Sequence, residues 1–374
     1  LRLRSALRAR HRRLPGKIAR ACRSRTGAPG RLSPDSCGMT DPVLQVEDLS
    51  VHYEVRGGGL LNSGRRTLKA VQEVSFDLRP GETLGVVGET GCGKSSLGRA
   101  VLQLVRPAGG RVVWQGRNLC GLPDSELKAV RKDLQVVFQD PLSSLNPRMT
   151  VGEIVAEPLR IHHPELSASE RNEKAAAMLE RVGLLPEMAR RYPNEFSGGQ
   201  CQRVSIARAM ILEPRVIVCD EPVSALDVSI QAQICNLLRA LQRDTGIAMI
   251  FISHDLSIVR YMAHRVLVMY LGRLVELASR ERFFARPCHP YSQALLAAVP
   301  EPDPSRPVHE YSEPVPGEVP SPLDPPSGCV FRTRCEHSTP VCVSQVPALE
   351  QAEDGHEIAC HHWRRLFKEP GATP

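Results

Sequence analysis

The chain has 374 residues, 42% of them hydrophobic, which suffices for one large domain with an appendage or for two domains. Its formal net charge is +7, but a nucleic-acid-binding surface would need these basic residues to be spread over the fold. No apolar run approaches the length of about 20 residues that a membrane-spanning helix needs, so at a membrane we expect other chains to do the spanning.

The basic charge is concentrated in residues 1–38, which carry ten arginines and one lysine against the single acid Asp35. This balance of +10 leaves −3 for the rest of the chain. The segment begins with Leu and stops just before Met39, so we expect Met39 to be the natural start. Residues 1–38 then form an over-extended reading frame or a disordered arm. An organellar targeting peptide and a polybasic arm that contacts anionic lipid or nucleic acid are the alternatives.

Two strands are predicted before the first motif. Residues 43–55 alternate between apolar and polar side chains, and residues 69–78 form a second strand-like segment that ends in a turn. Tyr53 lies in the first of these strands. It is either a half-buried strand residue, which the spacing alone favours, or an aromatic that stacks on a nucleotide base.

The segment TLGVVGETGCGKSS, residues 83–96, combines an apolar strand, a glycine-rich turn and the start of a helix. Its spacing G-x-x-x-x-G-K-[ST] lets backbone N–H groups and a helix N-terminus converge on a phosphate. Lys94 would contact the β- and γ-phosphates, and the Ser95 hydroxyl would bind Mg²⁺. We expect the phosphate contacts to come from Gly88, Glu89, Thr90, Gly91, Cys92, Gly93, Lys94, Ser95 and Ser96.

The α/β pattern continues and is then interrupted. After a helix over 94–105 we predict a strand at 111–115, a short helix at 125–131 and a buried strand at 134–138 that ends at Gln139. Helical patterns then fill much of residues 141–212. One of these helices opens with a capping box, S-x-x-E, and another follows the sequence FSGGQ.

Acidic residues follow the next predicted strand, residues 215–219. Because ligands bind at the carboxyl ends of parallel strands, Asp220 is placed to hold Mg²⁺ and Glu221 to polarise an attacking water. Two such acids could otherwise be ordinary helix caps. A helix over 228–243 and a strand over 247–253 follow, and His254 stands just past the end of that strand.

Taken in order, these motifs resemble the ATP-binding cassette of ABC transporters over about residues 43–280. They match its Walker A loop, Q-loop, signature, Walker B strand, D-loop and H-loop. One departure is Phe196, where most cassettes carry Leu. The matching segments are GETGCGKSS (88–96), Gln139, FSGGQ (196–200), VIVCDE (216–221), SALD (224–227) and His254.

Longer segments are similar to the dipeptide and oligopeptide permease branch, in particular its F-type ATP-binding subunits. Among them are FQDPLSSLNPRMTVGEIVAEPL, DEPVSALDVSIQAQ and HPYSQALLAAVP. The resemblance implies an α/β P-loop NTPase cassette over 39–284. It comprises a RecA-like core, an antiparallel β subdomain and a helical signature subdomain at about 141–212. A small Pro- and Cys-rich appendage over 285–374 would follow.

The resemblance also implies a mechanism in which two cassettes pair head to tail around ATP and Mg²⁺. The catalytic residues would be Lys94, Gln139, Glu221 and His254. Mg²⁺ would be arranged by Ser95, Gln139 and Asp220, and Tyr53 would stack on adenine. The ATP of the partner cassette would be contacted by Ser197, Gly198, Gly199, Gln200 and Asp227.

The implied partners are a second, D-type cassette, two membrane permease subunits and, indirectly, a solute-binding protein. The expected location is peripheral, at the cytoplasmic face of the bacterial inner membrane, and no nucleic acid is expected. Related cassettes serve importers of nickel or glutathione, so the solute stays open. A soluble ABC ATPase that acts on nucleic acid or ribosomes is the alternative, but it usually brings a second cassette or a long coiled coil.

Cysteines mark the C-terminal part, after a segment at 300–327 that holds ten prolines and reads as an extended linker. The spacing C-x5-C-x6-C-x17-C, without a secretory signal, favours a metal in a reducing compartment over disulfides. The resemblance favours a [4Fe-4S] cluster; zinc or uncoordinated cysteines are the alternatives. The four ligands would be Cys329, Cys335, Cys342 and Cys360.

Overall fold

The computed structural model describes residues 41–56, 65–299, 317–352 and 355–367. The predictions for residues 1–38 and for the proline-rich segment at 300–316 fall outside these residues. Over the described part of the chain, none of the helices combines the length and the apolar character that crossing a bilayer requires.

The main sheet has, over the described residues, eight strands in the order β11-β12-β10-β9-β3-β8-β7-β6. Its parallel centre is buried on both faces, as expected for strands covered by helices on each side. These parallel strands are β3 (Thr83–Val87), β6 (Leu134–Val137), β7 (Val216–Asp220), β8 (Ala248–Ile252) and β9 (Arg265–Tyr270).

Helices cover the two faces of this centre. Leu97 of α1 (Lys94–Val101) packs in a cluster with Val218 of β7. On the opposite face, Leu238 of α7 (Val228–Thr245) packs with Phe251 of β8, and the short helix α8 (Leu256–Met262) joins the same cluster. The carboxyl ends of β3, β7 and β8 therefore open at one edge, between the two helical layers.

A second, antiparallel sheet, with the order β2-β1-β4-β5 over the described residues, shares its core with α1. It corresponds to the predicted β subdomain, and the helix α2 (Asp124–Arg131) follows it. Its strands are β1 (Leu44–Arg56), β2 (Arg65–Leu78), β4 (Gly109–Trp114) and β5 (Arg117–Asn118).

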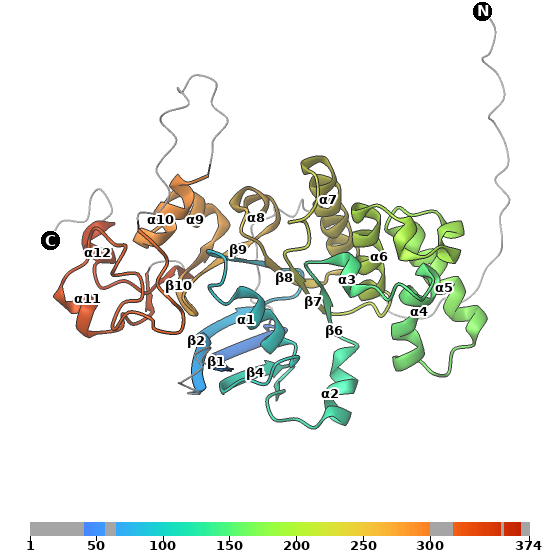
Figure 1. The fold of residues 1–374 in the computed structure, drawn as a ribbon, viewed down its shortest axis with the longest axis horizontal. Helices are drawn as coiled ribbons and strands as arrows, with labels where there is room; N and C mark the ends of the chain where they lie inside the picture. Colours follow the sequence, from blue (N-terminus) through green and yellow to red (C-terminus); the bar gives the residue numbers. More distant parts are fainter. Residues whose placement is uncertain (1–40, 57–64, 300–316, 353–354, 368–374) are drawn as a thin grey trace, which may run out of the picture. The chain divides into compact units, whose positions relative to one another are not determined.

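The helical insertion lies at the β6 edge of the main sheet (Figure 1). Its helices are packed on each other by residues such as Ile154, Leu179 and Val204. Ser167 forms the predicted capping box with Glu170, and equivalent boxes start α4 and α6. The elements are α3 (Pro141–Ser144), α4 (Val151–His162), α5 (Ala168–Arg181), the 3-10 turns Pro186–Arg190 and Pro193–Glu195, and α6 (Gly198–Met210).

The C-terminal region is joined to the main sheet by strand pairing that the sequence pattern does not predict. Strand β12 (Glu357–Ile358) pairs with β10 (Arg273–Ser279), and β11 (Glu350–Gln351) extends the same sheet. Figure 1 shows this region beyond the β10 edge, opposite the helical insertion. Its helices are α9 (Arg280–Ala285), α10 (Pro290–Ala297), α11 (Pro340–Ser344) and α12 (Trp363–Leu366).

A buried carboxylate fastens this junction. Glu276 on β10 is fully buried and accepts hydrogen bonds from the N–H groups of Cys288 (2.7 Å) and His289 (2.9 Å). His356, just before β12, adds a third contact at 2.7 Å. Because one carboxylate binds polar groups from two segments, its loss would leave several buried polar groups without a partner.

One difference from the predicted elements is the end of α1. The sequence pattern predicts a helix to residue 105, but α1 ends at Val101. Gln103 adopts a left-handed conformation with φ of 54°, and its side chain donates to the Ala100 carbonyl at 2.7 Å. This contact satisfies one of the carbonyls left at the helix end, so the helix stops there.

Candidate nucleotide-binding site

The phosphate-binding loop joins β3 to α1 and depends on glycine for its shape. Gly88 and Gly93 have φ of 148° and 106°, which side chains rarely tolerate. A Cβ atom at Gly88 would lie 2.2 Å from the Met269 carbonyl oxygen, and one at Gly93 would lie 2.1 Å from that of Ala70. The sequence spacing therefore reflects two points of close backbone approach.

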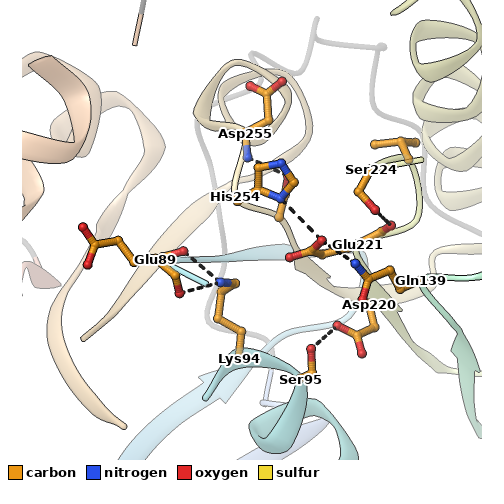
Figure 2. A network of polar contacts seen from close by, with 12 residues as sticks. Glu89, Lys94, Ser95, Gln139, Asp220, Glu221, Ser224, His254 and Asp255 are labelled. Carbon is orange, nitrogen blue, oxygen red and sulfur yellow. Dashed lines mark hydrogen bonds and ion pairs between the residues drawn. The ribbon is translucent and has the colours of Figure 1, made fainter. Parts of the chain in front are cut away.

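Lys94 lies inside this loop, with 5% of the residue exposed. Its Nζ donates to the carbonyl oxygens of Gly88 (2.8 Å) and Glu89 (3.1 Å), as Figure 2 shows. The ammonium group thus sits at the N-terminus of α1, where the helix dipole adds to its positive charge. Cys92 is buried beside it, and this burial raises the pKa of its thiol. The arrangement can hold a phosphate.

Two oxygen ligands suited to Mg²⁺ meet next to the loop. Ser95, in the first turn of α1, donates from Oγ to Oδ1 of Asp220 at the end of β7, at 2.7 Å. Burial raises the pKa of the Asp220 carboxyl group. A hydroxyl and a carboxylate at this spacing, beside a phosphate loop, are typical Mg²⁺ ligands.

Glu221 is placed by an unusual backbone. Its φ is 47°, a left-handed conformation that costs a non-glycine residue about 1–3 kcal/mol. Its Oε2 accepts a hydrogen bond from Gln139 Nε2 at 2.9 Å and lies 3.4 Å from His254 Nδ1. Figure 2 shows this carboxylate on the same side as Lys94, so a base, an amide and an imidazole meet at the strand ends.

A cavity of about 370 Å³ is lined by these groups. Tyr53 also lines it and donates from its hydroxyl to Ser96 Oγ at 3.3 Å. The volume falls within the range of small-ligand pockets. The remaining lining residues are Leu68, Lys69, Ala70, Thr90, Gly91, Gly93, Lys94, Ser95, Gln139, Glu221, His254, Leu271, Gly272 and Pro322.

The predicted signature residues do not line this cavity. Ser197 instead caps α6 and accepts from the N–H of Gln200 at 3.4 Å, while Ser197 and Gly198 are exposed. Gly199 approaches α7 so closely that a Cβ there would lie 2.6 Å from Ile230. Asp227 stands at the N-terminus of α7 without a side-chain capping bond. These residues form a second surface.

Comparisons with known proteins agree with this geometry. Residues 71–224 match the family described as ABC transporter, and residues 275–342 match the oligopeptide/dipeptide transporter C-terminal region. The oligopeptide transport ATP-binding protein OppF of Escherichia coli is 54% identical over 85% of this chain and 95% of its own length. A probable peptide ABC transporter ATP-binding protein of Sinorhizobium fredii is 53% identical over 86% and 90%. The chain belongs to the ABC transporter family.

Solved ABC cassettes share the fold. A cassette solved as a dimer in a post-hydrolysis state with ADP and phosphate is 28% identical, with a TM-score of 0.57 over 63% of this chain and 98% of that one. A subunit of an ABC transporter complex from Clostridium perfringens is 26% identical, with a TM-score of 0.56 over 66% and 92%. The predicted cassette fold is confirmed.

The four C-terminal cysteines of this ABC cassette lie near one another. Cys342 Sγ is 3.6 Å from His362 Nε2, and burial raises the pKa of the Cys329 thiol to about 11, with the other three cysteines contributing. Among the described residues, however, the group whose ligand atoms all lie within 4.8 Å of one another is Glu276, Cys288 and His356. The cysteines are therefore more widely spaced than a single tetrahedral zinc ion requires.

The Glu276 group has no need of a metal. Its carboxylate already accepts three hydrogen bonds inside the cassette, and burial raises the pKa of the Cys288 thiol to about 11.

One contact of the phosphate loop was not predicted. The carboxylate of Glu89 binds Arg334 of the C-terminal region, with Oε2–Nη1 and Oε1–Nη2 distances of 2.7 and 3.0 Å. The N–H of Glu89 donates to the hydroxyl of Tyr291 at 2.8 Å. Nothing in the local sequence pattern indicates these partners, because about 200 residues or more separate them from Glu89.

Proposed function

We propose that this ABC cassette is the ATP-hydrolysing subunit of a peptide importer and that each of its ATP sites is completed by a second cassette. The observation that carries the proposal is that Lys94, Glu221 and His254 line one cavity, while Asp220 accepts a hydrogen bond from Ser95 in its wall. The similarity to oligopeptide transport ATP-binding proteins, over nearly their full length, supplies the transport role.

The proposed residue roles are those that the resemblance to ABC cassettes implies, and the geometry of the cavity supports them. The loop from Gly88 to Ser96 and the Lys94 ammonium hold the phosphates of ATP. Ser95 and Asp220 bind Mg²⁺, together with Gln139. Glu221 then accepts a proton from the attacking water, and His254, 3.4 Å from its carboxylate, contacts the γ-phosphate. Tyr53, which also lines the cavity, stacks on adenine.

A second cassette is needed because the signature lies outside the cavity. Ser197 and Gly198 are exposed at the N-terminus of α6, where free backbone N–H groups favour an anion. In a head-to-tail pair they contact the ATP of the partner, together with Gly199, Gln200 and Asp227. Hydrolysis then waits for closure of the pair, since charge on the γ-phosphate is stabilised from both sides.

The transport partners are two permease subunits that span the membrane, supplied with peptide by a solute-binding protein. Leu142, exposed in α3 shortly after Gln139, supports a docking surface for a permease helix next to the ATP site. Docking there would hold the cassette at the cytoplasmic face of the bacterial inner membrane. A D-type cassette is the proposed second ATPase subunit.

The C-terminal cysteines are the proposed ligands of a [4Fe-4S] cluster. Their wide spacing suits a cluster better than one zinc ion. Cys329, Cys335, Cys342 and Cys360 would hold it as thiolates. Iron and sulfide assays on anaerobically purified protein, with the absorbance near 400 nm, test this; a colourless protein with stoichiometric zinc contradicts it.

The function is tested with the complex in membrane vesicles. The cassette, its partner cassette, the permease subunits and the solute-binding protein are reconstituted, and uptake of labelled tripeptides is measured with ATP on the cassette side. We expect uptake and phosphate release to depend on each other. Uptake of nickel or glutathione in place of peptides would change the assignment of the solute. A rate of ATP hydrolysis that does not respond to any solute, without uptake, would contradict the transport role.

A further inference from the structure

The phosphate loop contains an acid at an unfavourable place for a site that binds a polyphosphate. Glu89 directly follows Gly88, and its main-chain carbonyl oxygen contacts Lys94 Nζ at 3.1 Å. Figure 2 shows its carboxylate turned away from Lys94. An unpaired carboxylate in this loop would repel the phosphates of ATP, since like charges interact more strongly in a partly buried site than in water.

Arg334 neutralises that carboxylate with two parallel hydrogen bonds of 2.7 and 3.0 Å. The side chains of Arg334 and Glu89 are only 4% and 23% exposed. A bidentate pair of this kind is both directional and strong, and burial protects it from screening by salt. Arg334 therefore sets the orientation of Glu89 as well as its charge.

Aromatic residues keep this pair in place. The Tyr291 hydroxyl accepts the N–H of Glu89, and the Tyr270 hydroxyl accepts from Arg334 at 3.4 Å. The two rings are 4.7 Å apart, and Phe331 packs against both. The N–H of Arg334 in turn donates to the Phe331 carbonyl at 3.0 Å. Side chain and backbone of the loop residue are thus both held from the C-terminal region.

We propose that Arg334 is a positioning residue of the ATP site, which acts through Glu89 by cancelling its charge and fixing the start of the phosphate loop. This inference rests on the proposed ATPase function. It assigns to the C-terminal region a direct part in nucleotide affinity, in addition to its structural part in the sheet.

The test is a double-mutant cycle on the full chain with its partner cassette, read by calorimetric titration with ATP and Mg²⁺. We expect Arg334→Ala to weaken ATP binding about tenfold, because it leaves the Glu89 charge unpaired. Adding Glu89→Gln to this variant should restore most of the lost affinity, since the neutral amide no longer repels phosphate. Glu89→Gln alone completes the cycle.

Two further variants separate electrostatics from folding. Arg334→Lys keeps the positive charge but loses the two parallel hydrogen bonds of the guanidinium, so this variant should bind ATP better than Arg334→Ala does. Arg332→Ala is the matched control. Arg332 lies two residues before Arg334 in sequence, but it donates to the Ser327 carbonyl oxygen, so its loss should leave ATP affinity unchanged. Higher salt should reduce the penalty of Arg334→Ala.

The outcomes decide between the two proposals. ATP affinity of Arg334→Ala equal to that of the native chain would overturn the positioning role. The positioning role would also be overturned if Arg334→Ala with Glu89→Gln bound ATP as weakly as Arg334→Ala alone. An affinity lost only through packing is not restored by an amide at residue 89. If instead the native complex itself binds no ATP, the proposed function fails and not merely the role of Arg334.

Discussion

Two helix N-termini of this cassette offer backbone N–H groups to an anion, and they differ in how they are completed. The loop before α1 is enclosed by the second sheet, by Glu221 and His254, and by the C-terminal region through Arg334. The start of α6 is exposed and lies outside the described cavity. The same local chemistry is thus enclosed by the rest of the chain at one helix and exposed at the other.

The strongest test of the enclosed end is the variant Glu221→Gln. The amide keeps the shape and the contact with Gln139 but cannot accept a proton from water. We expect phosphate release by the assembled complex to fall at least about a hundredfold, with ATP binding retained. Glu213→Gln is the control, because Glu213 is an exposed glutamate that also has a positive φ, of 52°. Undiminished turnover in Glu221→Gln would contradict the assignment of the base.

The exposed end is tested by Ser197→Arg. A large side chain at the start of α6 should block approach of a partner's ATP and reduce hydrolysis by the complex about tenfold or more, as loss of transition-state contacts does. The ATP affinity of the isolated chain should not change, because Ser197 does not line its cavity. Ser169→Arg, on the exposed start of α5, provides the control. Weaker ATP binding by the isolated Ser197→Arg chain would contradict the division into two surfaces.

A smaller effect is expected at Tyr53, which belongs to the enclosed end. If its ring stacks on adenine, Tyr53→Ala should weaken ATP binding about tenfold, in the range of base–aromatic stacking. Tyr53→Phe keeps the ring and loses only the 3.3 Å contact with Ser96. It should therefore bind ATP nearly as the native chain does. Equal losses in both variants would assign the role to the hydroxyl group, and fluorescence titration distinguishes these results.

The last test concerns stability rather than nucleotide binding, and it addresses the C-terminal region. Burial lowers the pKa of His289 from 6.5 to about 4. The unfolded chain therefore binds a proton that the folded chain does not, so the free energy of unfolding should fall as the pH drops from about 6.5 towards 4. The slope from this group is up to about 1 kcal/mol per pH unit. Melting temperatures of the native chain and of His289→Gln across this range should differ in slope, and equal slopes would contradict the assignment.

The parts of the site that came from short motifs could be predicted, because local spacing alone determines them. Gly88, Gly93 and Lys94 stand within one turn, and Asp220 and Glu221 follow a strand whose buried pattern is plain. The partners of Glu89 could not be predicted, since nothing in the segments that contain Tyr291 and Arg334 indicates a contact with the phosphate loop. The pairing of β12 with β10 could not be predicted either, because a strand of two residues has too little periodicity to be recognised in the sequence.

The position of Arg334 in the chain has a consequence for biosynthesis. It is made 245 residues after Glu89, which corresponds to about 10 to 50 seconds of translation at typical rates. During that interval the nascent cassette has its phosphate loop but lacks the Arg334 guanidinium that is proposed to neutralise Glu89. If Arg334 acts as proposed, nucleotide affinity should therefore rise only after Arg334 has emerged from the ribosome.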